Sequence, residues 1–535
     1  MLHYEQTHML EHLLAIPILI LALLRQVALW QRKEYRLDRL LSPLKGGEIH
    51  STIKPIHLSI YSAITLAWLS YIIYPHNLVT PTLGWMALLA IIILFINDVL
   101  RRGLTRPTWT TRAALTTILT TILIFIYIFY LYNQLILTAL QWSTLTFFIP
   151  GLVGLSSAAI SLGAYVQKKR IITEAKILRK KRRLQVIGIT GSFGKTSTKH
   201  FLYQILDTTG QNVVATANHK NSEFTVAQDM LTQLASPRDI YIAEMGAYRK
   251  GEITALANLT QPQIGVITAI QNQHLALFGS LAKVQQAKSE LIAALPSSGF
   301  AILNADDENV VEVAQATSAQ IIWYSIQKPT NIYLSDVVYL TQSTKFNLHI
   351  GRSSLPVTTP IISAGLIKSL AAAMAAAHTT GMSIKDIASA LSSLKPFPQT
   401  MTIQTGLNKC TIINDSYSAS QGAVENALEH VQRFQKQDKR IVFTPIIELG
   451  SAGHAVHRQL GQLLGDISAT IHISNHLYKS AIEDGYQASN KQSKIIWYEH
   501  PLALAEAVSA GLTSKSLVLL EGRLPDVVHK ALNLS

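Results

Sequence analysis

Two hydrophobic patterns divide the chain near residue 166. Before it, apolar residues form long unbroken segments. After it, they form short runs that alternate with longer amphipathic stretches. The long segments cover 9–30, 56–74, 79–100, 113–132 and 143–166. Each is close to the ~20 residues that a helix needs to cross a bilayer. The pattern therefore predicts a membrane region of about five helices over residues 1–166.

The loops between these segments predict an orientation. Residues 31–55 and 101–112 are rich in Lys and Arg, whereas residues 75–78 and 133–142 contain neither. The positive-inside rule then predicts a multi-pass protein of the cell (inner) membrane, with its N-terminus outside and its C-terminal part in the cytoplasm. The first segment lacks a basic start and a small-residue cleavage site, so we do not interpret it as a signal peptide. An arrangement of four spans, with the first segment lying in the interface, stays open.

From residue 184 onward the pattern is that of an α/β protein. Strand-like runs at 186–189, 240–243, 264–268 and 300–303 alternate with helix-like runs at 197–206, 223–235, 281–295 and 365–379. A second block has strand-like runs at 411–414, 440–444, 470–473 and 516–520. Such alternation predicts mostly parallel sheets with helices on both faces. We therefore expect four parts: 1–166 in the membrane, a linker over 167–183, a central domain over 184–395 and a C-terminal domain over 396–535.

Composition agrees with a membrane part joined to a soluble part. Only 15% of residues are charged, against roughly 25% in a soluble domain. The single cysteine, Cys410, excludes a disulfide framework and a cysteine-based zinc site.

A dense basic run lies within 167–183. Its members are Lys168, Lys169, Arg170, Lys176, Arg179, Lys180, Lys181, Arg182 and Arg183. Directly after a span, such a run favours binding to anionic membrane lipids, at ~1 kcal/mol for each basic residue. It lacks the interleaved aromatic residues typical of base stacking, so we expect no nucleic-acid partner.

The strand at 186–189 leads into a glycine-rich turn and then a helix. This is the layout of a phosphate-binding loop, in which backbone N–H groups and the helix N-terminus bind phosphate oxygens. Lys195 can reach the terminal phosphates and the Thr196 hydroxyl can bind Mg²⁺. The residues expected to contact the nucleotide are Gly191, Ser192, Gly194, Lys195, Thr196 and Ser197. The spacing G-x-x-G-K-T is two residues shorter than the common form.

Further motifs follow in order along the chain. Residues 240–246 form a strand that ends in Glu244, and a carboxylate beside a phosphate loop is a natural Mg²⁺ ligand. Gly-Glu-Ile follows at 251–253, His-Leu-Ala-Leu-Phe-Gly-Ser at 274–280, Ala-Lys-Ser-Glu at 287–290 and Leu-Asn-Ala-Asp-Asp at 303–307.

Together these motifs resemble the Mur ligase family of ATP-dependent amide-bond-forming enzymes, most closely its MurF type, which adds D-alanyl-D-alanine. The short phosphate loop has the spacing of that family. The resemblance covers about 184–535 and continues at 414–420, at 448–450 with His457, and at 521–523. It implies a central P-loop domain and a Rossmann-like C-terminal domain.

The resemblance also implies a reaction. ATP phosphorylates a substrate carboxylate to an acyl phosphate, and an amine attacks it to give an amide, ADP and phosphate. The acceptor would be a cell-wall peptide precursor of peptidoglycan synthesis, and the amine donor an amino acid or a dipeptide.

Residue roles follow from the same resemblance. Lys195 would stabilise the transferring phosphoryl group, Thr196 and Glu244 would hold one Mg²⁺, and His274 a second. Lys288 matches the carbamylated lysine of the family, so Lys195, His274 and Lys288 form the expected catalytic set. The remaining expected contacts are Asp415 with the ATP ribose, Asn304 with nucleotide and Asn221 with substrate. Asn304 and Asp306 also suit a simple turn, and His457 is more often structural than catalytic.

Four departures from the family pattern stand out. The membrane region replaces the UDP-binding N-terminal domain, and residues 364–368 replace a His-Asn-x-x-Asn motif that contacts adenine. Gln399-Thr400 replaces a Gly-Arg pair, and Thr225 replaces a glycine. The lost arginine would remove a charge-assisted contact of ~1.5–3 kcal/mol.

Three functions stay open. The first is a membrane-anchored MurF-like ligase, whose substrate is soluble or lipid-linked. The second is a catalytically impaired, nucleotide-binding membrane scaffold, which the missing arginine and adenine contacts favour. The third is a polyglutamate-type amino-acid polymer ligase.

Overall fold

The computed structural model describes residues 2–32, 107–132, 139–271 and 278–534, apart from 418, 437, 448, 450 and 451, and five positions between 86 and 93. The chain divides into two compact units, Met1–Lys169 and Arg170–Ser535.

The first unit is helical in its described part. It contains α1 (Leu2–Arg32), α7 (Thr111–Tyr132) and most of α8 (Ala139–Lys181), which continues into the second unit. Among the residues that the structure describes, two stretches are long and apolar enough to cross a membrane, Thr111–Phe129 and Phe148–Lys181. The predicted segments 56–74 and almost all of 79–100 lie outside the described residues.

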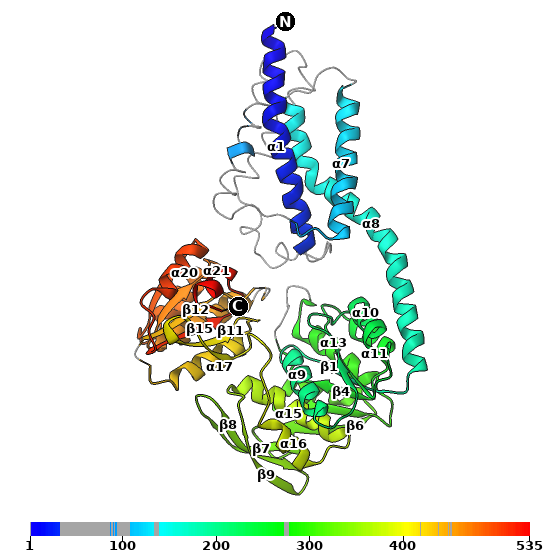
Figure 1. Cartoon of the computed structure of the whole chain (residues 1–535), viewed down its shortest axis with the longest axis vertical. Helices are drawn as coiled ribbons and strands as arrows, with labels where there is room; N and C mark the ends of the chain where they lie inside the picture. Colours follow the sequence, from blue (N-terminus) through cyan, green and yellow to red (C-terminus); the bar gives the residue numbers. More distant parts are fainter. Residues whose placement is uncertain are drawn as a thin grey trace. The chain divides into compact units, whose positions relative to one another are not determined.

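A nine-stranded sheet begins the second unit (Figure 1). Its strands run in the order β2-β3-β1-β4-β5-β6-β7-β8-β9. They are β1 (Gln185–Thr190), β2 (Val213–Ala215), β3 (Ile240–Glu244), β4 (Ile264–Ile267), β5 (Phe300–Asn304), β6 (Gln320–Ser325), β7 (Ile332–Tyr339), β8 (Thr344–Ile350) and β9 (Ser353–Thr359). Pairing is parallel from β2 to β7 and antiparallel from β7 to β9.

Helices cover both faces of this sheet, because successive side chains of each strand point to opposite faces. On β1, Ile187 and Ile189 join one core with α9 (Lys195–Asp207) and α15 (Ala364–Thr379). Val186 joins a second core with α10 (Glu223–Gln233), α11 (Glu252–Thr260) and α13 (Leu281–Ala293). The short α14 (Glu308–Glu312) and α16 (Ile384–Leu391) complete this part.

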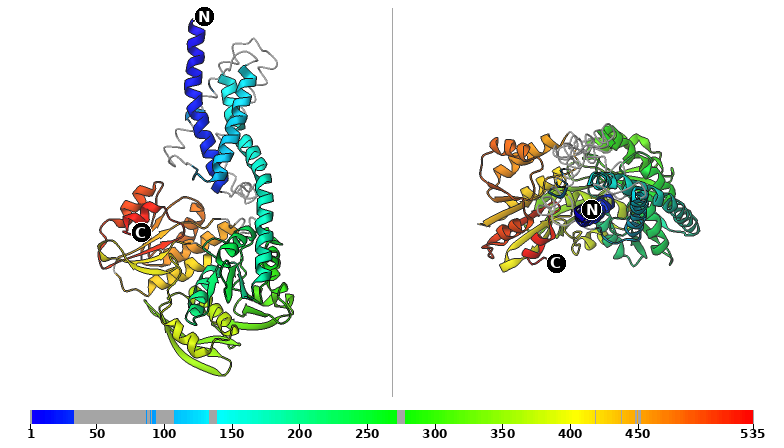
Figure 2. Two further views of the ribbon diagram at one scale, coloured as in Figure 1. Left: turned by 45° about the vertical axis from the view of Figure 1, so that its right-hand side comes forward. Right: turned by 90° about the horizontal axis from the view of Figure 1, so that it is seen from above.

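A six-stranded sheet follows, in the order β10-β11-β15-β12-β13-β14. Its strands are β10 (Thr402–Thr405), β11 (Thr411–Asp415), β12 (Asp438–Phe443), β13 (Thr470–Ile473), β14 (Lys494–Trp497) and β15 (Ser516–Glu521), and only β10 is antiparallel. One core contains residues of α17 (Gln421–Gln432) and α18 (Gly453–Asp466), and another contains residues of α20 (Pro501–Ser509) and α21 (Asp526–Ala531). The remaining helix, α19 (Lys479–Gln487), packs on α18. Figure 2 shows both sheets with their helices.

The predicted α/β class with mostly parallel sheets is confirmed. Each predicted strand begins and ends within one residue of the ends of an observed strand. The exception is 440–444, because β12 begins two residues earlier. The antiparallel extension β7–β9 was not predicted. Its side chains alternate between buried and partly exposed positions, so they form no continuous apolar run.

The expected linker over 167–183 is helical as far as Lys181, as the final turns of α8. Within the second unit these turns pack on the sheet domain, where Ala175 is fully buried. The Arg179 guanidinium donates to the carbonyl oxygens of Thr260 (2.7 Å), the last residue of α11, and Gln261 (3.2 Å), which caps that helix. Part of the basic run is therefore committed to holding the helix on the domain.

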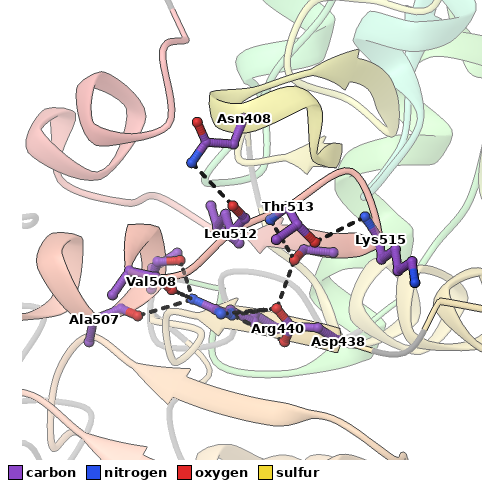
Figure 3. A network of polar contacts seen from close by, with 10 residues as sticks. Asn408, Asp438, Arg440, Ala507, Val508, Leu512, Thr513 and Lys515 are labelled. Atoms are coloured by element: carbon purple, nitrogen blue, oxygen red, sulfur yellow. Dashed lines mark hydrogen bonds and ion pairs between the residues drawn. The ribbon is translucent and has the colours of Figure 1, made fainter.

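A polar network fixes α20 to the second sheet (Figure 3). The Arg440 guanidinium, on β12, donates to carbonyl oxygens at the C-terminal end of α20, those of Val508 (2.9 Å) and Ala510 (2.6 Å). It is held in place by an ion pair with Asp438 at 2.9 Å. The last carbonyls of a helix have no hydrogen-bond donor within the helix, and Arg440 supplies the missing donor here.

Candidate active site

The loop between β1 and α9 has a backbone that only glycine adopts readily. Gly191 has φ +152° and Gly194, which caps α9, has φ +78°. A Cβ atom on Gly191 would lie 2.0 Å from Thr268 Oγ1, and one on Gly194 would lie 2.7 Å from Ser369 Oγ. Side chains at either position would therefore both strain the backbone and displace a neighbour.

Contacts with the segment after β4 hold this loop. The Ser192 N–H donates to the Ala269 carbonyl at 2.7 Å, and the Gln271 N–H donates to Ser192 Oγ at 3.0 Å. The Thr268 hydroxyl donates to the Phe193 carbonyl. These hydrogen bonds fasten the loop to the segment after β4, which pre-organises its backbone as a phosphate cradle requires.

Lys195 is the first residue of α9, two positions earlier than the predicted helix start. Its ammonium lies over the loop and donates to the carbonyl oxygens of Gly191 (2.7 Å) and Ser192 (3.3 Å). Burial lowers its pKa, and the nearby carboxylate of Glu244 opposes that shift.

Glu244 ends β3 and is almost fully buried. Its Oε2 accepts from Thr196 Oγ1 at 3.1 Å, and its Oε1 accepts from Asn221 Nδ2 at 3.2 Å. Burial raises the pKa of this carboxyl, but Lys199 and Lys195 outweigh burial, so the pKa lies below its usual value. The side chain is therefore a carboxylate at neutral pH.

Lys199 is not among the site residues expected from the sequence. Its ammonium lies 3.0 Å from Glu244 Oε2. It follows Lys195 by four residues, which places both on the same side of α9. That spacing was a signal in the sequence, although it does not reveal that Lys199 is buried.

Lys288 lies on α13 and is 4% exposed. Burial and the charge of Lys195 lower its pKa to about 7, and Glu252 and Glu290 only partly oppose this. A large fraction of the amine is therefore neutral at physiological pH.

The residues at the end of β5 mainly shape a turn. Asn304 Nδ2 donates to the Thr268 carbonyl at 3.0 Å, and its Oδ1 accepts from the Asp306 N–H. Asp306 accepts from Ser325 Oγ and the Ile326 N–H. The Asn304 bond holds the segment after β4, on which the phosphate loop rests, and the Asp306 bonds hold the turn against the end of β6.

Asp415 ends β11 and is almost fully buried. Burial raises its pKa to about 7, although its Oδ1 accepts from the Met401 N–H at 3.1 Å. Tyr417 follows two residues later and stacks on His219, with ring centroids 5.7 Å apart. Burial and the charge of Glu244 raise the Tyr417 pKa, and this ring from the second sheet domain lines the same cavity as the phosphate loop.

One cavity of about 570 Å³ joins these groups. Of the residues expected from the sequence, it is lined by Ser192, Gly194, Lys195, Thr196, Ser197, Asn221, Glu244, Lys288, Asn304 and Asp415. Gly191 lies in the loop but does not line the cavity, and His274 lies outside the described residues. Segments more than 200 residues apart thus converge on one site.

The departures from the family pattern also fall at this cavity. Gly365, Lys368 and Thr400 line it, in the segments where the adenine-contacting motif and the arginine were expected. Thr225 has a local role, because its hydroxyl accepts from the Ser222 N–H and completes a capping box at the start of α10.

His457 has a structural position. Its Nε2 accepts from the Ile446 N–H at 3.0 Å, and its Nδ1 lies 2.7 Å from the Gly453 carbonyl. Burial lowers its pKa to about 4, so the ring is neutral.

Oxygen donors suit a magnesium ion here. Thr196 Oγ1 and Glu244 Oε2 lie side by side at 3.1 Å, and hydroxyl and carboxylate oxygens are the ligands that Mg²⁺ prefers. Within the described part of the chain, no group of three or more His, Cys, Asp or Glu residues gathers as a metal cage. The Thr196 and Glu244 oxygens therefore fit a magnesium ion at this position.

Comparisons with known proteins agree with this geometry. A family described as the Mur ligase middle domain matches residues 189–377. The UDP-N-acetylmuramoyl-tripeptide–D-alanyl-D-alanine ligase of Escherichia coli is 30% identical over 281 residues, which are 52% of this chain and 61% of that ligase. The chain thus spans about three fifths of that relative, and the match leaves the rest of both proteins unaligned.

Solved structures show the same fold. MurF from Acinetobacter baumannii superposes with a TM-score of 0.60 at 22% identity, covering 68% of this chain and 79% of that one. MurF ligase from Thermotoga maritima in complex with ADP gives a TM-score of 0.59 at 23% identity, covering 68% and 84%.

Proposed function

We propose that the protein, whose residues 189–377 match the Mur ligase middle domain and which is similar to MurF ligases, is an ATP-dependent, ADP-forming amide ligase. The observation that carries the proposal is one cavity that holds Lys195, Thr196, Glu244 and Lys288 beside Asp415 of the second sheet domain. A glycine loop supplies phosphate contacts, and oxygen ligands for a metal lie directly beside it.

Each group has a role in such a reaction. The N–H groups of the loop and the N-terminus of α9 bind the phosphates, and Lys195 stabilises the transferring phosphoryl group. Thr196 and Glu244 would hold Mg²⁺, which when bound neutralises phosphate charge. His274 remains the proposed holder of a second ion and Asp415 the proposed ribose contact. The product of phosphoryl transfer is an acyl phosphate, which the amine attacks with loss of phosphate.

We propose that Lys288 becomes carbamylated. Its pKa of about 7 leaves a neutral amine that can add to CO₂, forming an N–C bond and releasing one proton. The product is a carboxylate next to Lys195 that can serve as a metal ligand. With ¹³C-bicarbonate, the wild-type protein should give a carbamate carbon signal that Lys288→Met lacks. A wild-type protein without that signal would exclude the modification.

The substrates come from the similarity to the E. coli ligase, whose name contains UDP-N-acetylmuramoyl-tripeptide and D-alanyl-D-alanine. The full chain in detergent should release ADP only when both substrates are present and should form the joined peptide, detected by its mass. Lys195→Met should lower the rate at least 100-fold. Wild-type protein that binds ATP but makes no amide would overturn the proposal, and amide formation with glutamate alone would favour a polymer ligase.

Anchoring in the cell membrane, with the ligase part in the cytoplasm and the N-terminus outside, is a further part of the proposal. Two stretches have the length and composition of spans. Large apolar side chains are exposed on α7 and α8, among them Phe125, Phe129, Leu155 and Leu162. The chain should remain in the membrane fraction after a carbonate wash. Release into the wash would contradict integral anchoring.

Anchoring makes a lipid-linked acceptor accessible. We therefore propose that the full chain in vesicles acts faster on lipid-linked than on UDP-linked muramoyl peptide. Equal rates on both would count against the lipid-linked substrate and leave the ligase activity untouched.

The scaffold function remains the second candidate, because Gly365 and Thr400 line the cavity where adenine and arginine contacts were expected. A scaffold needs nucleotide binding without turnover. It would be favoured if Lys195→Met supported growth as well as wild type does.

A further inference from the structure

Lys199 is a buried cation at the metal side of the site to which the proposed reaction gives no role. Its side chain is 5% exposed, as is that of Glu244. The ammonium lies 3.0 Å from Glu244 Oε2 and donates to the Thr216 carbonyl at 2.9 Å. Charged side chains are rarely buried to this degree without a partner, and here the partner is the carboxylate expected to hold Mg²⁺.

The contacts of Glu244 are divided between its two oxygens. Oε2 is shared by the Lys199 ammonium and the Thr196 hydroxyl, and Oε1 accepts from Asn221 Nδ2. The backbone is held as well, because the Glu244 N–H donates to Thr216 Oγ1 at 3.0 Å. Thr216 therefore links Lys199 and Glu244 a second time, and the carboxylate has little freedom to turn.

The charges around this carboxylate favour one order of binding. Glu244 faces the Lys199 ammonium at 3.0 Å, and Lys195, four residues earlier on the same helix, adds a second positive charge to this side of the site. A bare divalent ion must approach the oxygen that already holds an ammonium. An ion that arrives bound to phosphates carries negative charge with it, which Lys195 attracts.

We propose that Lys199 is a positioning residue that keeps the Glu244 carboxylate aimed at Thr196, and that lowers the affinity of the site for free divalent ions so that the metal enters with the nucleotide. The proposal rests on the proposed function for the identity of the metal site. Lys199 acts through Glu244 and needs no contact with substrate.

Binding of Mn²⁺ tests the proposal without any ligase assay. The full chain in detergent is titrated with Mn²⁺ at pH 8, and the free ion is followed by its electron paramagnetic resonance signal. Lys199→Met should bind Mn²⁺ at least tenfold more tightly than wild type, because one positive charge beside Glu244 is gone. Adding ADP should tighten Mn²⁺ binding at least tenfold in wild type and less than threefold in Lys199→Met.

Matched variants separate charge from packing. Lys199→Arg keeps the charge and should stay within threefold of wild type. Lys345→Met removes an exposed lysine on β8 and should do the same. Lys199→Met should also unfold at a lower temperature in EDTA than wild type and gain more from Mn²⁺, since the ion replaces the lost cation. If Lys199→Met fails to fold, Lys199→Gln takes its place, because it keeps a donor without the charge.

Three results would overturn the proposal. One is an unchanged or weaker Mn²⁺ affinity in Lys199→Met or Lys199→Gln. Another is an ADP-induced increase in Mn²⁺ affinity that is equal in Lys199→Met and wild type. The third is the absence of measurable Mn²⁺ binding in every form of the protein. Failure of the ligase assay with wild type would instead remove the proposed function and leave the Mn²⁺ results to stand.

Discussion

Glu521 and Asp415 form a pair of buried carboxyls on neighbouring strands. They are register partners at the ends of β15 and β11, and Glu521 is fully buried. Neither Glu521 oxygen has a hydrogen-bond partner among the described residues. Burial and the charge of Asp415 raise the Glu521 pKa well above its usual value, so the pair holds a proton at neutral pH.

This pair predicts a pH dependence of stability. A carboxyl whose pKa is higher in the folded state stabilises the fold below its unfolded value, near 4.5, and that stabilisation is lost as pH rises through the folded value. Glu521→Gln removes the titration. Its free energy of unfolding should exceed that of wild type by ~1–3 kcal/mol at pH 8 and match it near pH 5. Thermal unfolding from pH 5 to 8 measures this, and parallel curves for the two proteins would contradict it.

Gly191 predicts a local effect on nucleotide binding. Gly191→Ala would place a Cβ atom 2.0 Å from Thr268 Oγ1 and force the phosphate loop to move. We expect affinity for ADP, measured by titration calorimetry, to fall at least tenfold. Gly210→Ala is the matched control, because Gly210 also has a positive φ but has open space around it. Equal losses in both variants would show that backbone strain, and not the clash, is responsible.

At the scale of elements, single side chains hold helices to sheets. Arg440 donates to carbonyls at the end of α20 and pairs with Asp438 on its own strand. Arg179, in the last turns of α8, likewise donates to two carbonyls at the end of α11. In both cases a guanidinium supplies several donors to carbonyls that a helix leaves without partners.

Arg440→Met should destabilise the second sheet domain by ~2–4 kcal/mol, because the Val508 and Ala510 carbonyls lose their guanidinium donor and Asp438 loses its ion pair. Lys436→Met removes one exposed bond to the Ser514 carbonyl and should cost less than 1 kcal/mol. Urea unfolding monitored by circular dichroism compares them. Similar midpoints for the two variants would mean that the Arg440 network adds little.

At the scale of the whole second unit, the cavity is built from two sheet domains. Tyr417 comes from the segment after β11 and stacks on His219, which precedes α10. The ring of Phe397 packs edge-on against two other rings, with its centroid 4.8 Å from that of Tyr417 and 5.5 Å from that of His200. This chain of rings links the domains beside the phosphate loop.

Tyr417→Ala should therefore weaken closure of the domains over the nucleotide. We expect kcat/KM of the proposed ligase reaction to fall at least tenfold, with little change in thermal stability. Tyr417→Phe keeps the stacked ring and should retain most activity. If Tyr417→Phe loses as much as Tyr417→Ala, the hydroxyl and not the stacking is the important group.

The sequence by itself determined the α/β class, the position of the phosphate loop and the carboxylate that ends β3. These depend on contiguous residues: apolar runs form buried strands, and glycines permit the loop backbone. Membrane spans, the carbamylated lysine and the substrates remain proposals.

Only the tertiary structure decided which charges meet. Lys199 and Glu244 are 45 positions apart, and Asp415 and Glu521 are 106 apart, yet parallel strand pairing and the helix after β1 bring each pair together. Burial then sets their pKa values, because it depends on packing from several elements at once. For the same reason, the sequence could not show that Asn304 donates to the Thr268 carbonyl or that Lys288 is buried within reach of the charge of Lys195.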